Sequence, residues 1–274
     1  MSRGADCRGT CFVSANVTHR ANFFGSFRVW LSDRAVALGP VTCRTLLKWL
    51  LLHPGERFNV EQLCGVLWPD APTRRNSLHV ALHHLRTRLE PNLERGSRST
   101  FVRSDGAGHY WFDAADRWCT DIDELNALIQ SADTQADSTT AIHLYQAALD
   151  VYERTFLAED LYNDAFADSR QAFETQYLNA LQTLTGLLIR LDRFPEALQL
   201  ATHHLEADPY SDEALLAAVR IYQASNDSAA AVALISRYTN RLHLELGIRP
   251  SDKVQRLADR LRRNISQGQT LLRG

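Results

Sequence analysis

The chain has 274 residues, of which 45% are apolar and 23% charged, and its formal net charge is −2 at pH 7. A chain of this length can bury a substantial core and suits one large domain or two smaller ones. Its longest apolar run, residues 46–52, is interrupted by a lysine and is far shorter than the roughly 20 residues that span a bilayer. The first 22 residues lack the apolar region of a secretory signal, so we expect a cytoplasmic protein without a membrane span.

The charge is divided unevenly along the chain. Residues 23–112 contain 12 Lys/Arg and 7 Asp/Glu, a net charge of +5, whereas residues 113–274 contain 15 and 24, a net charge of −9. A basic half joined to an acidic half is typical of a nucleic-acid-binding module fused to a protein-interaction module.

The N-terminal segments indicate two short strands. Residues 23–30 (FFGSFRVW) and 34–38 (RAVAL) are rich in aromatic and β-branched residues, with a turn between them at Ser32-Asp33. Residues 1–22 fit no element and are expected to form a flexible extension.

Two helices are predicted next. Residues 42–53 place leucines on an inner face and stop at Pro54-Gly55, while Arg44 and Lys48 are expected to face solvent. Residues 59–68 form the second helix, with Asn59 as N-cap and Gln62 three positions on, the spacing of a capping box.

A third helix is predicted over residues 74–90 (RRNSLHVALHHLRTRLE), with a single apolar stripe at Leu78, Leu82, Leu85 and Leu89. Asparagine and histidine can both donate and accept hydrogen bonds at base edges. The candidates for base contacts on the side away from the stripe are Asn76, His79, His83 and Thr87. Cationic side chains position a protein on phosphates without specifying sequence. The candidates for phosphate contacts are Arg74, Arg75, His84, Arg86, Arg88 and Arg103.

A hairpin is predicted over residues 100–112, with its turn at the glycines of 106–108. Strands, three short helices and a hairpin, in that order, indicate a winged helix-turn-helix whose third helix can enter a major groove. The stretches LLLHPGERFNVEQLCGVLWPDA, HVALHHLRTRLEP and FVRSDGAGHYWF resemble the OmpR-type winged helix of the SARP regulators and other bacterial transcriptional activators. This chain departs from the pattern at His83-His84, where the family often has paired arginines.

The remainder is predicted to be helical, at residues 120–132, 138–153 and about 164–191. Aligning residues 191–198 with 225–232 places Ala197 over Ala231 and Asp192 over Asn226, a period of 34 that is typical of tetratricopeptide helix pairs. The stretches DPYSDEALLAAVRIY and LELGIRPSDKVQRL resemble the bacterial transcriptional activator domain, the helical partner of the winged helix in these regulators.

Catalytic and metal sites find little support in the sequence. Cys7 and Cys11, with His19 downstream, lack a second pair of zinc ligands. His79 and His83 have zinc-ligand spacing but neither a third ligand nor a glutamate between them. We therefore expect no enzyme, no metal and no cofactor.

The sequence predicts a mainly α protein, with an N-terminal winged helix-turn-helix that carries a small β-sheet and wing hairpin, followed by an all-α tetratricopeptide-like helical-repeat domain. The expected divisions are an extension at 1–22, a DNA-binding domain at 23–113, an activator domain at 114–265 and a tail at 266–274. The resemblance implies a sequence-specific activator that binds double-stranded promoter DNA and either dimerises or contacts RNA polymerase. The alternative is a helical-repeat adaptor whose winged helix mediates protein contacts.

Overall fold

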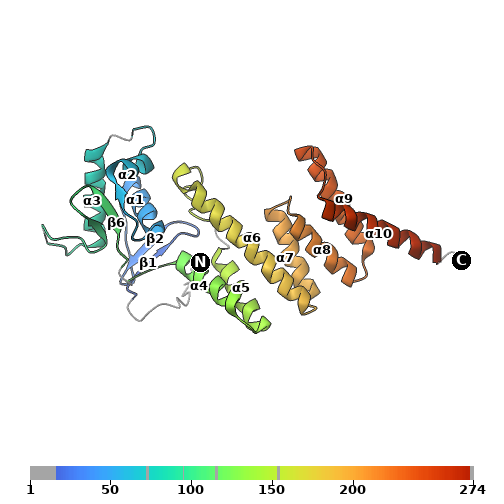
Figure 1. Ribbon diagram of the computed structural model, residues 1–274. Coiled ribbons are helices and arrows are strands. Elements are labelled where there is room, and N and C mark those ends of the chain that lie inside the picture. Colours follow the sequence, from blue (N-terminus) through green and yellow to red (C-terminus); the bar gives the residue numbers. More distant parts are fainter. Residues whose placement is uncertain (1–16, 72–73, 95, 115–116, 153–154, 272–274) are drawn as a thin grey trace, which may run out of the picture. The chain divides into compact units, whose positions relative to one another are not determined.

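The structure is a computed structural model that describes residues 17–71, 74–94, 96–114, 117–152 and 155–271 (Figure 1). The chain divides into two compact units. Of the described residues, those within 17–127 and 151–171 belong to the first unit, and those within 128–150 and 172–271 belong to the second. The compact units therefore do not divide at residue 113, where the domain boundary was expected. The described residues up to 127 and within 151–171 belong to the same unit as the N-terminal part of the chain.

A four-stranded sheet of order β3-β2-β1-β7 lies in the first unit. Its strands are β1 (His19–Asn22), β2 (Arg28–Leu31), β3 (Arg34–Ala35) and β7 (Trp118–Thr120). β1 pairs antiparallel with β2 and parallel with β7. The extension expected to reach residue 22 is wrong for residues 19–22, which form an inner strand. The sequence of β1, HRAN, has one aliphatic residue and no alternation of apolar and polar residues. It forms a strand because it pairs with β2 and β7 on either side. Residues 1–16 lie outside the described part.

The strand predicted from residue 23 begins only at Arg28. The backbone N–H of Phe23 donates to both carboxylate oxygens of Asp121, at 2.7 and 2.9 Å, and that of Phe24 donates to one of them at 2.9 Å. Gly25 follows with a φ of 89°, which interrupts an extended strand. A side chain nearly one hundred residues away thus satisfies the donors that a strand would have used.

Three helices and a second sheet complete the winged-helix part: α1 (Val41–Leu52), α2 (Val60–Leu67) and α3 (Arg75–Leu89). The capping box is confirmed, because Gln62 N donates to Asn59 Oδ1 at 2.9 Å and Asn59 N to Gln62 Oε1 at 2.8 Å. The second sheet has the order β4-β6-β5, from β4 (Phe58–Asn59), β5 (Val102–Ser104) and β6 (His109–Phe112). β5 and β6 form the predicted hairpin, with Val102 opposite Phe112.

The segment that begins at Thr155 is held in the first unit by its backbone and by a buried lysine. Gly25 N donates to Thr155 O at 2.9 Å, and Leu157 N donates to Phe23 O at 2.8 Å. The Nζ of Lys48 lies 2.6 Å from Glu159 Oε1 and also donates to Asp160. Lys48 is only 2% exposed, so the expectation that it faces solvent is wrong. Helix α1 is enclosed on nearly all sides, and the two acids supply the partners that a buried ammonium requires.

The remaining elements of the described residues are helices. They form α4 (Asp121–Thr134), α5 (Ser138–Tyr152), the short η1 (Asp164–Phe166), α6 (Ala167–Arg190), α7 (Phe194–Ala207), α8 (Asp212–Ala224), α9 (Ser228–Arg241), η2 (Leu242–Leu246) and α10 (Asp252–Leu271). α10 continues to Leu271, so the tail expected from residue 266 is helical at its start.

The period of 34 residues is confirmed by the backbone and the core of the second unit. Ala197 in α7 and Ala231 in α9 are both completely buried, as expected for small residues at close helix crossings. Asp192 and Asn226 occupy equivalent turns with φ values of 57° and 58°. Both residue types tolerate this left-handed backbone, which explains why the second turn forms without glycine.

Candidate nucleic-acid interface

The inner face of α3 fixes the helix against the rest of the winged helix. Its buried side chains are Leu78, Ala81, Leu82, Leu85 and Leu89, each at most 4% exposed. They pack toward α1 and α2, the two helices that contact α3 (Figure 1). The predicted apolar stripe is therefore confirmed, and it determines which side of α3 faces outward.

The outer face of α3 carries all four predicted base-contact residues, and each is exposed: Asn76, His79, His83 and Thr87. The hydroxyl of Thr87 donates to the carbonyl of His83 at 3.0 Å, so its oxygen can still accept a bond from another group. Val80 lies among these residues and is 55% exposed. The helical spacing of the leucine stripe already placed Val80 near the outer face, but its apolar character did not point to a polar interface.

Two predicted phosphate ligands are available on the surface. Arg74 and Arg88 are exposed, and neither side chain has a hydrogen bond or ion pair within the described residues. Arg75 is also exposed and pairs with the exposed Glu61 at 3.2 Å. An ion pair between two exposed side chains contributes little to the stability of a protein. Arg75 can therefore leave Glu61 and bind a phosphate with little loss of free energy. His84 is exposed as well and borders a shallow hollow with Asn76 and Val80.

The other two arginines predicted to contact phosphates make bonds at the hairpin: Arg86 from α3, and Arg103 from β5 itself. Arg86 is half-buried, its Nε donates to the carbonyl of Val102 at 3.0 Å, and its guanidinium lies over the ring of Tyr110. Burial lowers the pKa of Arg86 from its ordinary value. The Nε of Arg103 lies 2.8 Å from the carboxylate of Asp113. The structure therefore gives Arg86 and Arg103 a part in positioning the wing, which the sequence did not predict.

The turn of the hairpin is organised by Asp105. Its carboxylate accepts hydrogen bonds from Ala107 N at 2.8 Å and His109 N at 3.1 Å, and it lies 2.9 Å from His109 Nδ1. These hydrogen bonds, led by that from His109 N, lower the pKa of Asp105. Gly106 and Gly108 have φ values of 78° and 96°, as the tight turn requires. The wing tip is thus a defined loop that projects from β5 and β6.

Metal ligands do not gather in the described part of the chain, where no group of three or more His, Cys, Asp or Glu side chains could hold an ion. The rings of His83 and His84 lie 6.1 Å apart, edge to face, on the surface of α3. The candidate ligands Cys7 and Cys11 lie outside the described residues.

Comparison with known proteins identifies the family. The model of the bacterial transcriptional activator domain matches residues 120–262, about half of the chain. The chain belongs to this family. The resemblance of the helical half to this domain is thereby confirmed.

A solved structure shows the same fold. Mycobacterium tuberculosis EmbR, in complex with a low-affinity phosphopeptide, is 19% identical and superposes with a TM-score of 0.75. The match covers 90% of this regulator and 65% of the EmbR chain, so this chain spans less than two thirds of that protein. No curated protein matches the sequence. The likeness confirms a mainly helical fold with a small N-terminal β region and a helical-repeat part. Among the described helices, none has the length and apolar character needed to cross a membrane.

Proposed function

We propose that this regulator binds double-stranded promoter DNA in a sequence-specific manner, with α3 in the major groove and the β5–β6 wing against the neighbouring backbone. The observation that carries the proposal is the division of α3 into two faces. The leucine face is buried, whereas the opposite face carries hydrogen-bonding side chains that are exposed. A helix held in this way can present its outer face to base edges.

The base contacts are assigned to the outer face. Asn76 can form paired hydrogen bonds with adenine, and His79, His83 and Thr87 can donate to or accept from base edges. Val80 adds an exposed methyl-bearing side chain between them, which suits contact with the methyl group of thymine. This set combines polar and apolar recognition on one helix face.

The backbone contacts are assigned to the cations that the fold leaves available. Arg74 and Arg88 are the first choice, followed by Arg75 and His84. Arg86 and Arg103 support this interface indirectly, because they hold the wing in place. Phosphate contacts contribute affinity that is independent of sequence and falls as salt rises.

The helical-repeat half is assigned the contact with other proteins, either a second copy of the regulator or RNA polymerase. The family of the domain and its net negative charge support an interaction role over a second DNA-binding role. Such a protein would act in the cytoplasm, where bacterial promoters are.

The test is fluorescence-anisotropy titration of the full chain with duplex DNA from upstream of its own gene, over a range of salt concentrations. Arg88→Ala should weaken binding and reduce the slope of log K against log salt by about 1, because one phosphate contact is lost. It should leave thermal unfolding unchanged. Asn76→Ala should weaken binding to this duplex more than to a scrambled one.

The matched control is Arg86→Ala, which removes the same charge from the same helix. We expect it to destabilise the winged helix because it leaves the Val102 carbonyl without its donor. Absence of wild-type binding at low salt would reject the proposal and favour the adaptor alternative. Equal losses for scrambled and upstream duplexes with Asn76→Ala would reject base recognition by this face.

A further inference from the structure

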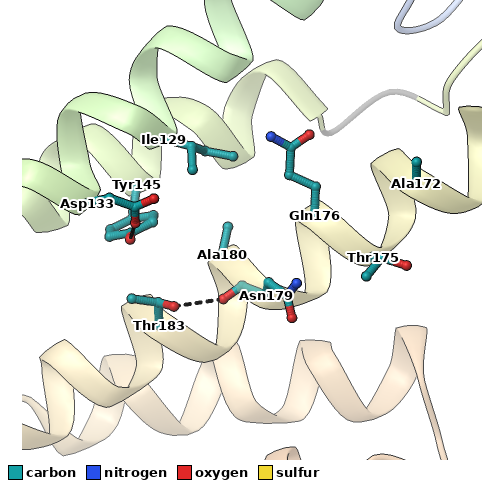
Figure 2. A pocket seen from close by; sticks show the side chains of 9 residues that line it. All are labelled: Ile129, Asp133, Tyr145, Ala172, Thr175, Gln176, Asn179, Ala180 and Thr183. Atoms are coloured by element: carbon teal, nitrogen blue, oxygen red, sulfur yellow. Dashed lines mark hydrogen bonds between the residues drawn. The ribbon is translucent and has the colours of Figure 1, made fainter.

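A hollow of about 430 Å³ lies in the second unit, between α6 and the helices α4 and α5 (Figure 2). α6 contributes one face of the hollow, with side chains on successive turns from Ala172 to Thr183. Ile129 and Asp133 come from α4, and Tyr145 comes from α5. None of these residues belongs to the winged helix or to the outer face of α3.

A fixed carboxylate borders the hollow. The hydroxyl of Tyr145 donates to Asp133 Oδ1, and Figure 2 shows the two side chains together opposite α6. Tyr145 is only 3% exposed, whereas Asp133 is exposed and has no ion-pair partner among the described residues. Burial, together with this bond, raises the pKa of Tyr145 to about 12, so the hydroxyl remains a donor at neutral pH. Asp133 is therefore held in place with its charge uncompensated.

Among the residues that line the hollow, Asp133 is the one acidic side chain and none is basic, whereas Arg170 and Arg190 of α6 do not line it. Residues 128–150 and 172–183 contain Asp133, Asp137, Asp150 and Glu174 but no lysine or arginine. An anionic ligand would be repelled here, whereas an ammonium or guanidinium group would be attracted. The charge of the lining thus selects a cation.

The rest of the lining suits a peptide backbone. Gln176 and Asn179 bring amide groups that can both donate and accept, and Ile129, Ala172 and Ala180 add apolar side chains to the lining. From Ala172 to Thr183 the helix rises about 16 Å, since each residue adds about 1.5 Å. An extended peptide of about five residues has the same length, at roughly 3.3 Å per residue.

We propose that this hollow, the peptide groove, binds an extended segment of a partner protein and that Asp133 receives an arginine or lysine side chain of that segment. The amides of Gln176 and Asn179 would hold the backbone of the segment. The proposal rests on the proposed role of the helical-repeat half in protein contacts, and it specifies the chemistry of the partner.

The test is selection of random heptapeptides displayed on phage against the full-length regulator, followed by anisotropy titration of the selected peptides. Asp133→Asn keeps an oxygen that can accept from Tyr145 but removes the charge. Asp150→Asn is the matched control, because it removes the same charge from an exposed site on α5 that does not line the groove. Thermal unfolding of each variant establishes that it is folded.

We expect the selected peptides to contain arginine or lysine and to bind Asp133→Asn at least tenfold more weakly than wild type. Asp150→Asn should bind them within twofold of wild type, and Asn179→Ala should weaken binding several-fold. Peptides without basic residues, or equal losses in the two aspartate variants, would overturn the proposal. Binding of spermidine in place of any peptide would also overturn it, because the site would then be one for small amines. DNA binding measured on the same variants should be unchanged. Failure of the peptide proposal can therefore be told apart from failure of the DNA-binding proposal.

Discussion

Replacing Lys48 with methionine tests whether the segment after Thr155 is an integral part of the winged-helix unit. Methionine keeps most of the length and apolar character of the lysine stem but removes the ammonium group. Glu159 and Asp160 then lose their shared cation, while their side chains are only 32% and 13% exposed. The substitution therefore leaves two close, partly buried carboxylates without a partner.

The expected loss in the free energy of unfolding is about 3 kcal/mol, the lower end of the range for removing one member of a buried ion pair. The lower end applies because both carboxylates retain some contact with water. Replacing all three residues, with Lys48→Met, Glu159→Gln and Asp160→Asn together, removes the unpaired charges. We expect this triple variant to be more stable than Lys48→Met alone.

The assay is urea unfolding of the full chain followed by tryptophan fluorescence. All five tryptophans lie between residues 30 and 118, so the signal reports on the first unit. With an m-value of about 2 kcal/mol/M, the midpoint should fall by about 1.5 M urea. A shift below about 0.3 M for Lys48→Met, or a triple variant less stable than the single one, would refute the reasoning.

Three further predictions concern the same unit. A fragment that ends at residue 113 should be unfolded, because it lacks β7, Asp121 and the segment after Thr155; a folded fragment by circular dichroism and fluorescence would contradict this. Burial raises the pKa of Asp121 to about 7, above its ordinary 3.8, so the folded state binds this proton more tightly. The free energy of unfolding of wild type should therefore fall relative to that of Asp121→Asn as pH rises from about 4 to about 7. Equal pH dependence of the two free energies would contradict this prediction. Arg86→Ala should cost about 1–2 kcal/mol, because a partly buried carbonyl loses its donor, and an unchanged urea midpoint would argue otherwise.

Local signals determined much of the winged-helix part and of the helical repeats. The leucine stripe specified which face of α3 is buried, because a helix with one apolar side packs that side. Asn59 and Gln62 specified the start of α2, because their two hydrogen bonds form within a single turn. The repeat period likewise predicted the equivalent positions of Ala197 and Ala231, since each helix pair buries the same small residue at its crossing.

The tertiary structure decided the features that depend on residues far apart in the chain. Asp121 accepts hydrogen bonds from the backbone N–H groups of Phe23 and Phe24. Glu159 and Asp160 form ion pairs with the buried ammonium of Lys48. Charge pairing and hydrogen bonds there offset the cost of removing charged groups from water. No local pattern in the sequence indicates such pairs, because their members lie about a hundred residues apart and only the fold brings them together. For the same reason the sequence alone grouped Arg86 with Arg88, although in the structure Arg86 bonds to the carbonyl of Val102 and Arg88 is exposed.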